Sequence, residues 1–224
     1  MKTQRFSMYF IGFVLLAGCA GPASRATPTP PVTPTLFIFP QATAPSSGAV
    51  TPGTTPLAVP ATICADPQVT ALIDSFKTAI LTSDGALLSS LVSPTRGMDV
   101  AFFRNGTVIT YDQAHARFLF ETTYQVDWGA DPGSGASKKG SFHDVVVPEL
   151  VRLFNQPYTL HCNELKHGGA TYELSWPYQG EFYSIYFPGT PANANLDWRT
   201  WAAGIEYVSG KPYIYALMQF FWEP

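Results

Sequence analysis

Three runs of sequence in the C-terminal part of the chain decide the fold: EFYSIYF at 181–187, WRTWAAGIEY at 198–207 and YIYALMQFFW at 213–222. Each run is rich in β-branched or aromatic residues, and Gly, Pro or Asn residues separate them, which is typical of strands. The run at 171–176 has the same character and predicts a further strand. Several of these strands are apolar on both faces. A bent sheet wrapped around a helix, leaving a lined hollow, would accommodate that pattern.

Helical signals precede the strands. Asp66-Pro67 has the residue types of a helix N-cap and a first helical position. The apolar residues that follow recur with the period of one helix face; they are Val69, Leu72, Ile73, Phe76, Ala79 and Ile80. We expect Asp84-Gly85 to end this helix and a short second helix to follow over 86–92.

The middle of the chain contains turn signals. Asn105-Gly106 predicts a hairpin turn between strands at 98–103 and 107–111. Asp112 is expected to cap a short helix that runs to about residue 119.

A second capping signal lies further along. Ser141 and Asp144 form a capping box ahead of a helix at 145–154, and Pro148 is expected to kink or restart that helix. Helices followed by a run of strands indicate an α+β domain rather than a parallel α/β sheet. We therefore predict one globular α+β domain over 61–224, with N-terminal helices packed on a curved antiparallel sheet.

The N-terminus has the pattern of an export signal. Two positive charges precede an apolar stretch at 6–16, which is too short to span a bilayer. The stretch ends in LAGC at 16–19, which resembles the cleavage box of bacterial lipoproteins, where the Cys thiol receives lipid and becomes the new N-terminus. This predicts a signal peptide over 1–18, a lipid on Cys19, and an extracytoplasmic protein anchored at the cell membrane or outer membrane. An ordinary secretory signal with an incidental cysteine is the alternative.

A linker is predicted from the lipidated cysteine to residue 60. Residues 20–60 contain ten prolines and eight threonines. Proline removes backbone donors and fixes φ, so the segment is expected to be a disordered, extended tether. LFIF at 36–39 interrupts it, either as a docking strip or as a short apolar interruption with no role of its own.

Two cysteines remain once Cys19 is assigned to lipid. Cys64 opens the folded region and Cys162 falls on a predicted strand in the middle of the domain. Because export makes an oxidising compartment possible, we expect a Cys64–Cys162 disulfide. Two buried free thiols are the alternative.

Composition excludes some partners and cofactors. The chain of 224 residues has a formal net charge of −3, so it has no basic surplus for a nucleic acid. It contains no Gly-x-Ser-x-Gly elbow and no phosphate-cradling glycine loop. Its four histidines lack the spacing of a metal site. We therefore expect no cofactor, no metal and no nucleic acid.

Three segments carry a family resemblance: LVSPTRG at 91–97, WGADPGSG at 128–135, and the closing pair of 197–198 with Trp222. In this order they resemble a group of uncharacterised bacterial lipoproteins whose domain is similar to the nuclear transport factor 2-like cone. The resemblance covers about 66–222. It implies a curved antiparallel sheet around helices, with a pocket between them.

The resemblance does not transfer a site. The chain has Pro132 where the group's loop has an acidic residue, and it has no Asp or His beside Trp222. Cone domains include isomerases and cyclases as well as many non-catalytic binding modules. Two functions therefore follow: a lipid-anchored binding or interaction module for an unknown ligand, or a small-molecule enzyme, isomerase-like or hydrolase-like.

Four residues are candidates for a ligand pocket. Trp128, beside the glycine-rich loop, and Trp198 offer apolar surface, and Tyr124 offers a hydroxyl. Core packing is the alternative for the tryptophans. His143 would be the general base of an enzyme, or simply part of an exposed helix start. The partners expected are the membrane, through the lipid, and a small apolar ligand or an envelope protein.

Overall fold

The computed structural model describes residues 62–224, so the predicted signal peptide, Cys19 and the predicted linker lie outside the described residues. The helices are α1 (Pro67–Thr82), α2 (Gly85–Leu91), α3 (Gln113–Ala116) and α4 (Phe142–Phe154). The strands are β1 (Met98–Ala101), β2 (Val108–Tyr111), β3 (Val126–Ala130), β4 (Ser137–Gly140), β5 (Thr159–Cys162), β6 (Phe182–Phe187), β7 (Arg199–Val208) and β8 (Lys211–Phe221). Within 62–224, no helix combines the length and the apolar character needed to cross a membrane.

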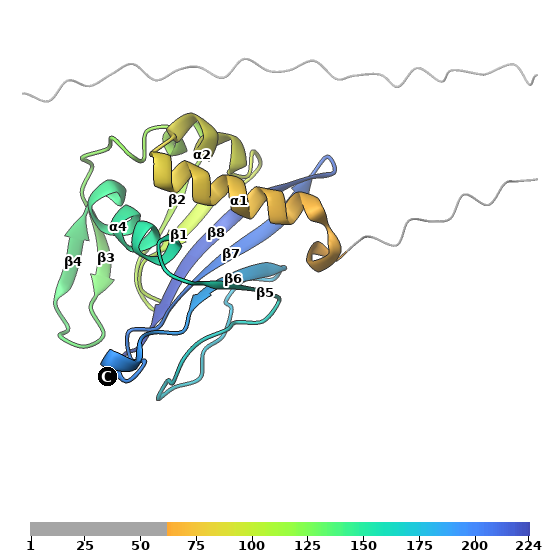
Figure 1. Cartoon of the computed structure of the whole chain (residues 1–224). Helices are drawn as coiled ribbons and strands as arrows, with labels where there is room; N and C mark the ends of the chain where they lie inside the picture. Colours follow the sequence, from red (N-terminus) through yellow and green to blue (C-terminus); the bar gives the residue numbers. More distant parts are fainter. Residues whose placement is uncertain (1–61) are drawn as a thin grey trace, which may run out of the picture. The chain divides into compact units, whose positions relative to one another are not determined.

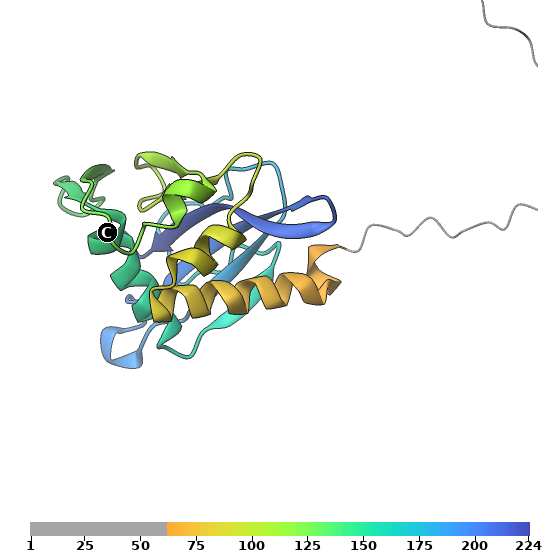
Figure 2. The ribbon, with the colours of Figure 1, turned by 90° about the horizontal axis from the view of Figure 1, so that it is seen from above.

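Helices pack on one face of a six-stranded sheet with the order β2-β1-β8-β7-β6-β5. Figure 1 shows α1, α2 and α4 on this face, and Figure 2 shows α1 and α2 from above as a layer beside the strands. β3 and β4 form a separate hairpin next to α4. The predicted α+β class is confirmed.

One strand pair differs from the prediction. All neighbours in the large sheet are antiparallel except β1 and β8, which pair in parallel. β8 is the last strand of the chain and lies between β1 and β7. Because most of the domain separates β1 from β8 in sequence, no tight turn forces them to run in opposite directions.

Asp66, Asp112 and Ser141 cap helices as predicted, whereas Asp84 was expected only to end the first helix and also caps α2, and α4 begins at Phe142 rather than at 145. Each capping side chain accepts a hydrogen bond from a backbone N–H inside its helix: Asp66 from Gln68 at 2.8 Å, Asp84 from Leu87 at 2.9 Å, Asp112 from His115 at 2.8 Å and Ser141 from Asp144 at 3.1 Å. The prediction for Pro148 was wrong in part, because α4 is one helix that contains it and does not restart there. Pro148 is exposed, and the solvent side of a helix tolerates lengthened hydrogen bonds.

Two other predictions need correction. Residues 171–176 form no strand; Leu174 and Trp176 instead pack against the sheet face that the helices leave uncovered. The strand-like composition of 171–176 thus belongs to a segment that packs on the sheet without joining it. The hairpin at Asn105-Gly106 exists, but its strands end at Ala101 and resume at Val108, so its loop is longer than two residues.

The β7–β8 hairpin gives the sheet its curvature. Ser209 and Gly210 have φ values of 52° and 79° between the paired residues Val208 and Lys211, which is the left-handed geometry of a tight hairpin turn. Further along, Gly204 pairs with Ala216 and Ile205 pairs with Ile214, so Tyr215 is an extra residue on β8. A bulge of this kind bends the strand and increases its twist.

Cys64 and Cys162 are joined in a disulfide with their Cα atoms 5.5 Å apart and 98 positions apart in sequence. The bond links the turn before α1 to β5, which is an edge strand of the sheet. In the chain-entropy description, closing a loop of about 100 residues stabilises a fold by about 4.7 kcal/mol.

We expect the Cys64→Ser/Cys162→Ser variant to lower the free energy of unfolding by about 2–5 kcal/mol, because the unfolded chain is no longer constrained. Urea denaturation of the variant and of the unreduced chain measures the difference. Thiol titration of a denatured, unreduced Cys19→Ser chain provides the control: two reactive thiols would exclude the bond.

Candidate functional site

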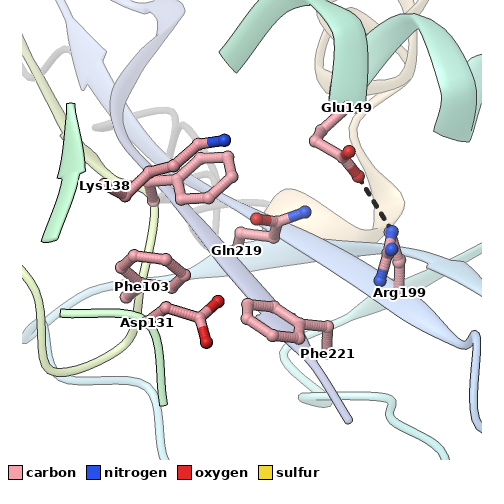
Figure 3. Close-up of a pocket in the computed structure, with 8 residues that line it drawn as sticks. Phe103, Asp131, Lys138, Glu149, Arg199, Gln219 and Phe221 are labelled. Atoms are coloured by element: carbon pink, nitrogen blue, oxygen red, sulfur yellow. Dashed lines mark ion pairs between the residues drawn. The ribbon is translucent and has the colours of Figure 1, made fainter. Parts of the chain in front are cut away.

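A pocket of about 190 Å³ lies between α4, the β3–β4 hairpin and the ends of β7 and β8. We call it the α4 pocket, and Figure 3 shows how its side chains converge from these elements. Its lining consists of three aromatic rings, four charged side chains and one amide: Phe102, Phe103, Phe221, Asp131, Lys138, Glu149, Arg199 and Gln219. This mixed lining differs from the apolar one that the tryptophans suggested.

The alternation of side chains along β7 and β8 determines which residues form the floor of the pocket. Side chains two residues apart on a strand share a face, and Trp201 lies in the core under the helices, so Arg199 also points to the helix side. On β8, Gln219 pairs with Trp201 and Phe221 pairs with Arg199. The β7–β8 register therefore puts a guanidinium, an amide and an aromatic ring side by side.

An ion pair forms one wall. Arg199 Nε lies 2.9 Å from Glu149 Oε2 on α4, and the two side chains are only 19% and 26% exposed. The two atoms are close, yet they lack the alignment of a hydrogen bond. Burial lowers the pKa of Arg199, while the Glu149 carboxylate favours its charged form. A guanidinium stays protonated in proteins, so Arg199 keeps its positive charge.

The β3–β4 hairpin forms the opposite wall. Asp131 Oδ1 accepts hydrogen bonds from the backbone N–H of Gly133 at 3.0 Å and of Ser134 at 2.8 Å. The bonds from Ser134 are the main cause that holds the pKa of Asp131 below its usual value. Lys138 Nζ lies 5.9 Å from the ring centroid of Phe102. The carboxylate is thus held in place by its own loop.

Several buried polar atoms of the domain have no hydrogen-bond partner with good geometry. Six buried side-chain polar atoms have no hydrogen-bond partner within the described residues: Glu149 Oε2, Arg199 Nε, Gln219 Oε1, Trp201 Nε1, Trp176 Nε1 and Tyr215 Oη. The first three belong to pocket-lining residues, and Trp201 pairs with Gln219 across the hairpin. Gln219 is only 2% exposed. Since Glu149 Oε2 and Arg199 Nε form an ion pair with each other, the Gln219 amide oxygen is the one polar atom of the pocket lining, within the described residues, that is left without a partner, although most buried polar groups in folded proteins are hydrogen-bonded.

The four predicted pocket residues lie elsewhere, and none of them lines the α4 pocket. Trp128 is buried, and its indole N–H donates to the Gly140 carbonyl at 3.1 Å. Trp198 is buried on the opposite face of the sheet. Tyr124 is 75% exposed. His143 is 54% exposed beside Asp144 at the start of α4, as the helix-start alternative predicted.

The sequence contained a signal for the residues of the α4 pocket that the sequence analysis did not select. Gln219 is a polar residue inside an apolar strand run and Arg199 is a charged residue at the start of another run, and buried polar side chains need a partner or a function. Asp131 and Lys138 flank the glycine-rich loop that drew attention to Trp128. Across residues 62–224, no group of three or more His, Cys, Asp or Glu side chains is placed to hold a metal.

No family model matches the chain, and no curated protein matches it. Among solved structures it is similar to a putative calcium/calmodulin dependent protein kinase II association domain from Xanthomonas campestris, with 10% identity and a TM-score of 0.28 over 68% of this chain and 84% of that chain. It is also similar to a protein described as "Rd1NTF2_04 with long sheet", with 10% identity and a TM-score of 0.24 over 67% of this chain and 98% of that chain.

We expect Gln219→Met to raise the free energy of unfolding by about 1 kcal/mol, because it removes a buried amide oxygen that has no partner and keeps the side-chain length. Gln113→Met is the matched control. The Gln113 amide donates to the Val92 carbonyl at 2.9 Å, so its loss should lower stability by a similar amount. Thermal or urea denaturation measures both variants, and a strong loss of stability in Gln219→Met would show that its amide is already bonded.

Proposed function

We propose that this chain is a lipid-anchored, extracytoplasmic binding module that takes a small polar ligand in the α4 pocket. The observation that carries the binding role is the Gln219 amide oxygen, which is buried without a hydrogen-bond partner beside a pocket that charged and aromatic side chains line. Such an atom costs stability unless a ligand or water completes its hydrogen bonds.

The proposed lipid anchor is supported by the N-terminal sequence. LAGC at 16–19 follows a charged and then an apolar segment, and the resemblance to bacterial lipoproteins with a cone-like domain agrees with that pattern. Each buried lipid methylene contributes about 0.8 kcal/mol, so two long chains hold a protein stably at a membrane. A disulfide between Cys64 and Cys162 suits an oxidising compartment outside the cytoplasm.

A cone-fold enzyme is the alternative function, and the chemistry of the pocket favours it less. A general base works best when its pKa lies near the operating pH and its lone pair faces the substrate. Here the Glu149 carboxylate faces Arg199, and hydrogen bonds from Ser134 lower the pKa of Asp131. Asp131 thus favours its ionised form, and the Glu149 carboxylate is already engaged by a guanidinium.

We expect the chain to be recovered from the membrane fraction of bacteria as a mature form that begins at Cys19 and carries lipid. The Cys19→Ser variant, which has no thiol to modify, should remain unlipidated. Mass spectrometry of the N-terminal peptide decides between them. A mature chain that starts beyond Cys19 and has no lipid would contradict the anchor.

We expect the full chain to bind at least one small molecule from a panel of neutral polyols, amino acids, carboxylates and amines in a saturable manner. Saturation of the shift in thermal unfolding temperature with concentration measures binding. Gln219→Met should abolish the shift, whereas Gln113→Met should retain it. A panel in which no class binds, or binding that is unchanged in Gln219→Met, would refute a ligand site in the α4 pocket.

A further inference from the structure

Residues 222–224 run past one end of the α4 pocket. Phe221, the last residue of β8, lines the pocket. Three positions later, Pro224 lies beside the β3–β4 loop: a Cβ added at Gly133 would be 3.3 Å from Pro224 Cγ and 3.4 Å from Asp131 Oδ1. Asp131 also lines the pocket (Figure 3). Residues 222–224 therefore connect the wall that contains Phe221 with the wall that contains Asp131.

Side chains rather than the backbone hold this segment. The β7–β8 ladder ends at the pair of Arg199 and Phe221, and the backbone of 222–224 makes no hydrogen bond with the backbone of another described residue. Trp222 is partly buried against the sheet face that the helices leave uncovered. Segments with few backbone bonds open locally at a lower free energy than the strands and helices around them. The position of 222–224 therefore depends on the contact that Glu223 makes.

Arg104 makes that contact. Its Nε–H donates to Oε1 and Oε2 of Glu223, both at 3.1 Å, and its Nη2 lies 3.0 Å from Oε2. The Glu223 side chain is 8% exposed and the Arg104 side chain is 28% exposed. Bonds between charged groups are stronger than those between neutral groups, and a buried carboxylate that loses its partner is left without compensation. Once the pair is broken, Glu223 is more stable in water, which requires residues 222–224 to move outward.

The same guanidinium contacts a third segment, the connection between β5 and β6. Arg104 Cζ lies 3.8 Å from the ring centroid of Tyr172, and the Tyr172 hydroxyl donates to the Phe221 carbonyl at 3.2 Å. A planar guanidinium pairs with a carboxylate and stacks on a ring at the same time, whereas the ammonium of a lysine is a point charge. Tyr172 thus aligns Arg104 with Glu223 and fixes the backbone from which residues 222–224 extend.

We propose that Arg104 and Glu223 form a latch on the α4 pocket. While the pair is intact, residues 222–224 close the end of the pocket between Phe221 and Asp131. When the pair breaks, they move out as a unit, the pocket floor becomes accessible, and the sheet and the helices stay folded. The role of this latch as a gate for a ligand rests on the proposed binding function, whereas the latch itself rests on the contacts of Arg104 and Glu223.

The test measures how fast a small reagent reaches the pocket floor. In a Cys19→Ser chain, Gln219→Cys places one free thiol there, because Cys64 and Cys162 are joined in a disulfide. Methyl methanethiosulfonate, which is small and neutral, labels that thiol. Arg104→Met and Glu223→Gln should each raise the labelling rate about tenfold or more, because each breaks a buried ion pair.

Two controls separate the latch from general effects. Arg96→Met is the matched substitution, because the Arg96 guanidinium also stacks on a tyrosine ring, that of Tyr215 at 4.0 Å, and lies 3.7 Å from a carboxylate oxygen of Glu206. Glu206 is near the turn of the β7–β8 hairpin, away from the pocket, so Arg96→Met should leave the labelling rate unchanged. Leu217→Cys, as a second reporter, places the thiol two positions earlier on β8 in the buried core and should label slowly in every variant.

Two results overturn the latch. One is an equal labelling rate of Gln219→Cys with and without the Arg104–Glu223 pair. The other is faster labelling of Leu217→Cys in the same variants, which would mean that the whole core loosens. The panel of small molecules tests the proposed binding function separately: faster labelling of Gln219→Cys in a chain that binds no member of the panel supports the latch and refutes the ligand site.

Discussion

The register of the β7–β8 hairpin is the constraint on which the candidate site depends. A two-residue turn at Ser209-Gly210 and the extra residue Tyr215 on β8 together fix the pairing, and the pairing sets Gln219 opposite Trp201 and Phe221 opposite Arg199. Because side chains alternate between the two faces of a strand, a slip of β8 by one residue would turn the Gln219 amide away from the helices. The turn and the bulge therefore determine which side chains line the pocket.

Around this hairpin, the other elements complete the pocket from distant parts of the chain. α4 brings Glu149 against Arg199, and the β3–β4 hairpin brings Asp131 and Lys138. The C-terminus is also held close: the Arg104 guanidinium bonds Glu223 through Nε at 3.1 Å and lies 3.8 Å from the ring centroid of Tyr172. Glu223 is buried. This contact keeps the end of β8 in place beside the pocket.

Features encoded by neighbouring residues were predictable from the sequence. The caps at Asp66, Asp112 and Ser141 bond backbone groups two or three positions away, so a local pattern suffices to find them, although the cap at Asp84 was not predicted. The pocket was not predictable in this way, because its residues meet only through strand register and helix packing. Trp128 and Trp198 are large and apolar, and the structure uses them in the core, where their indole groups already donate to Gly140 and Gly169. The informative residues were instead the polar ones inside apolar strands.

The central claim is that the Gln219 amide at the α4 pocket meets a bound ligand, and NMR of side-chain N–H groups tests it most directly. In the full chain saturated with the small molecule that binds best, the Gln219 amide signals should shift. The indole N–H signals of Trp128 and Trp198, which are already bonded, should stay in place and serve as internal references. A bound molecule that leaves the Gln219 signals unshifted, or that shifts the Trp198 signal on the other face of the sheet, would contradict the account.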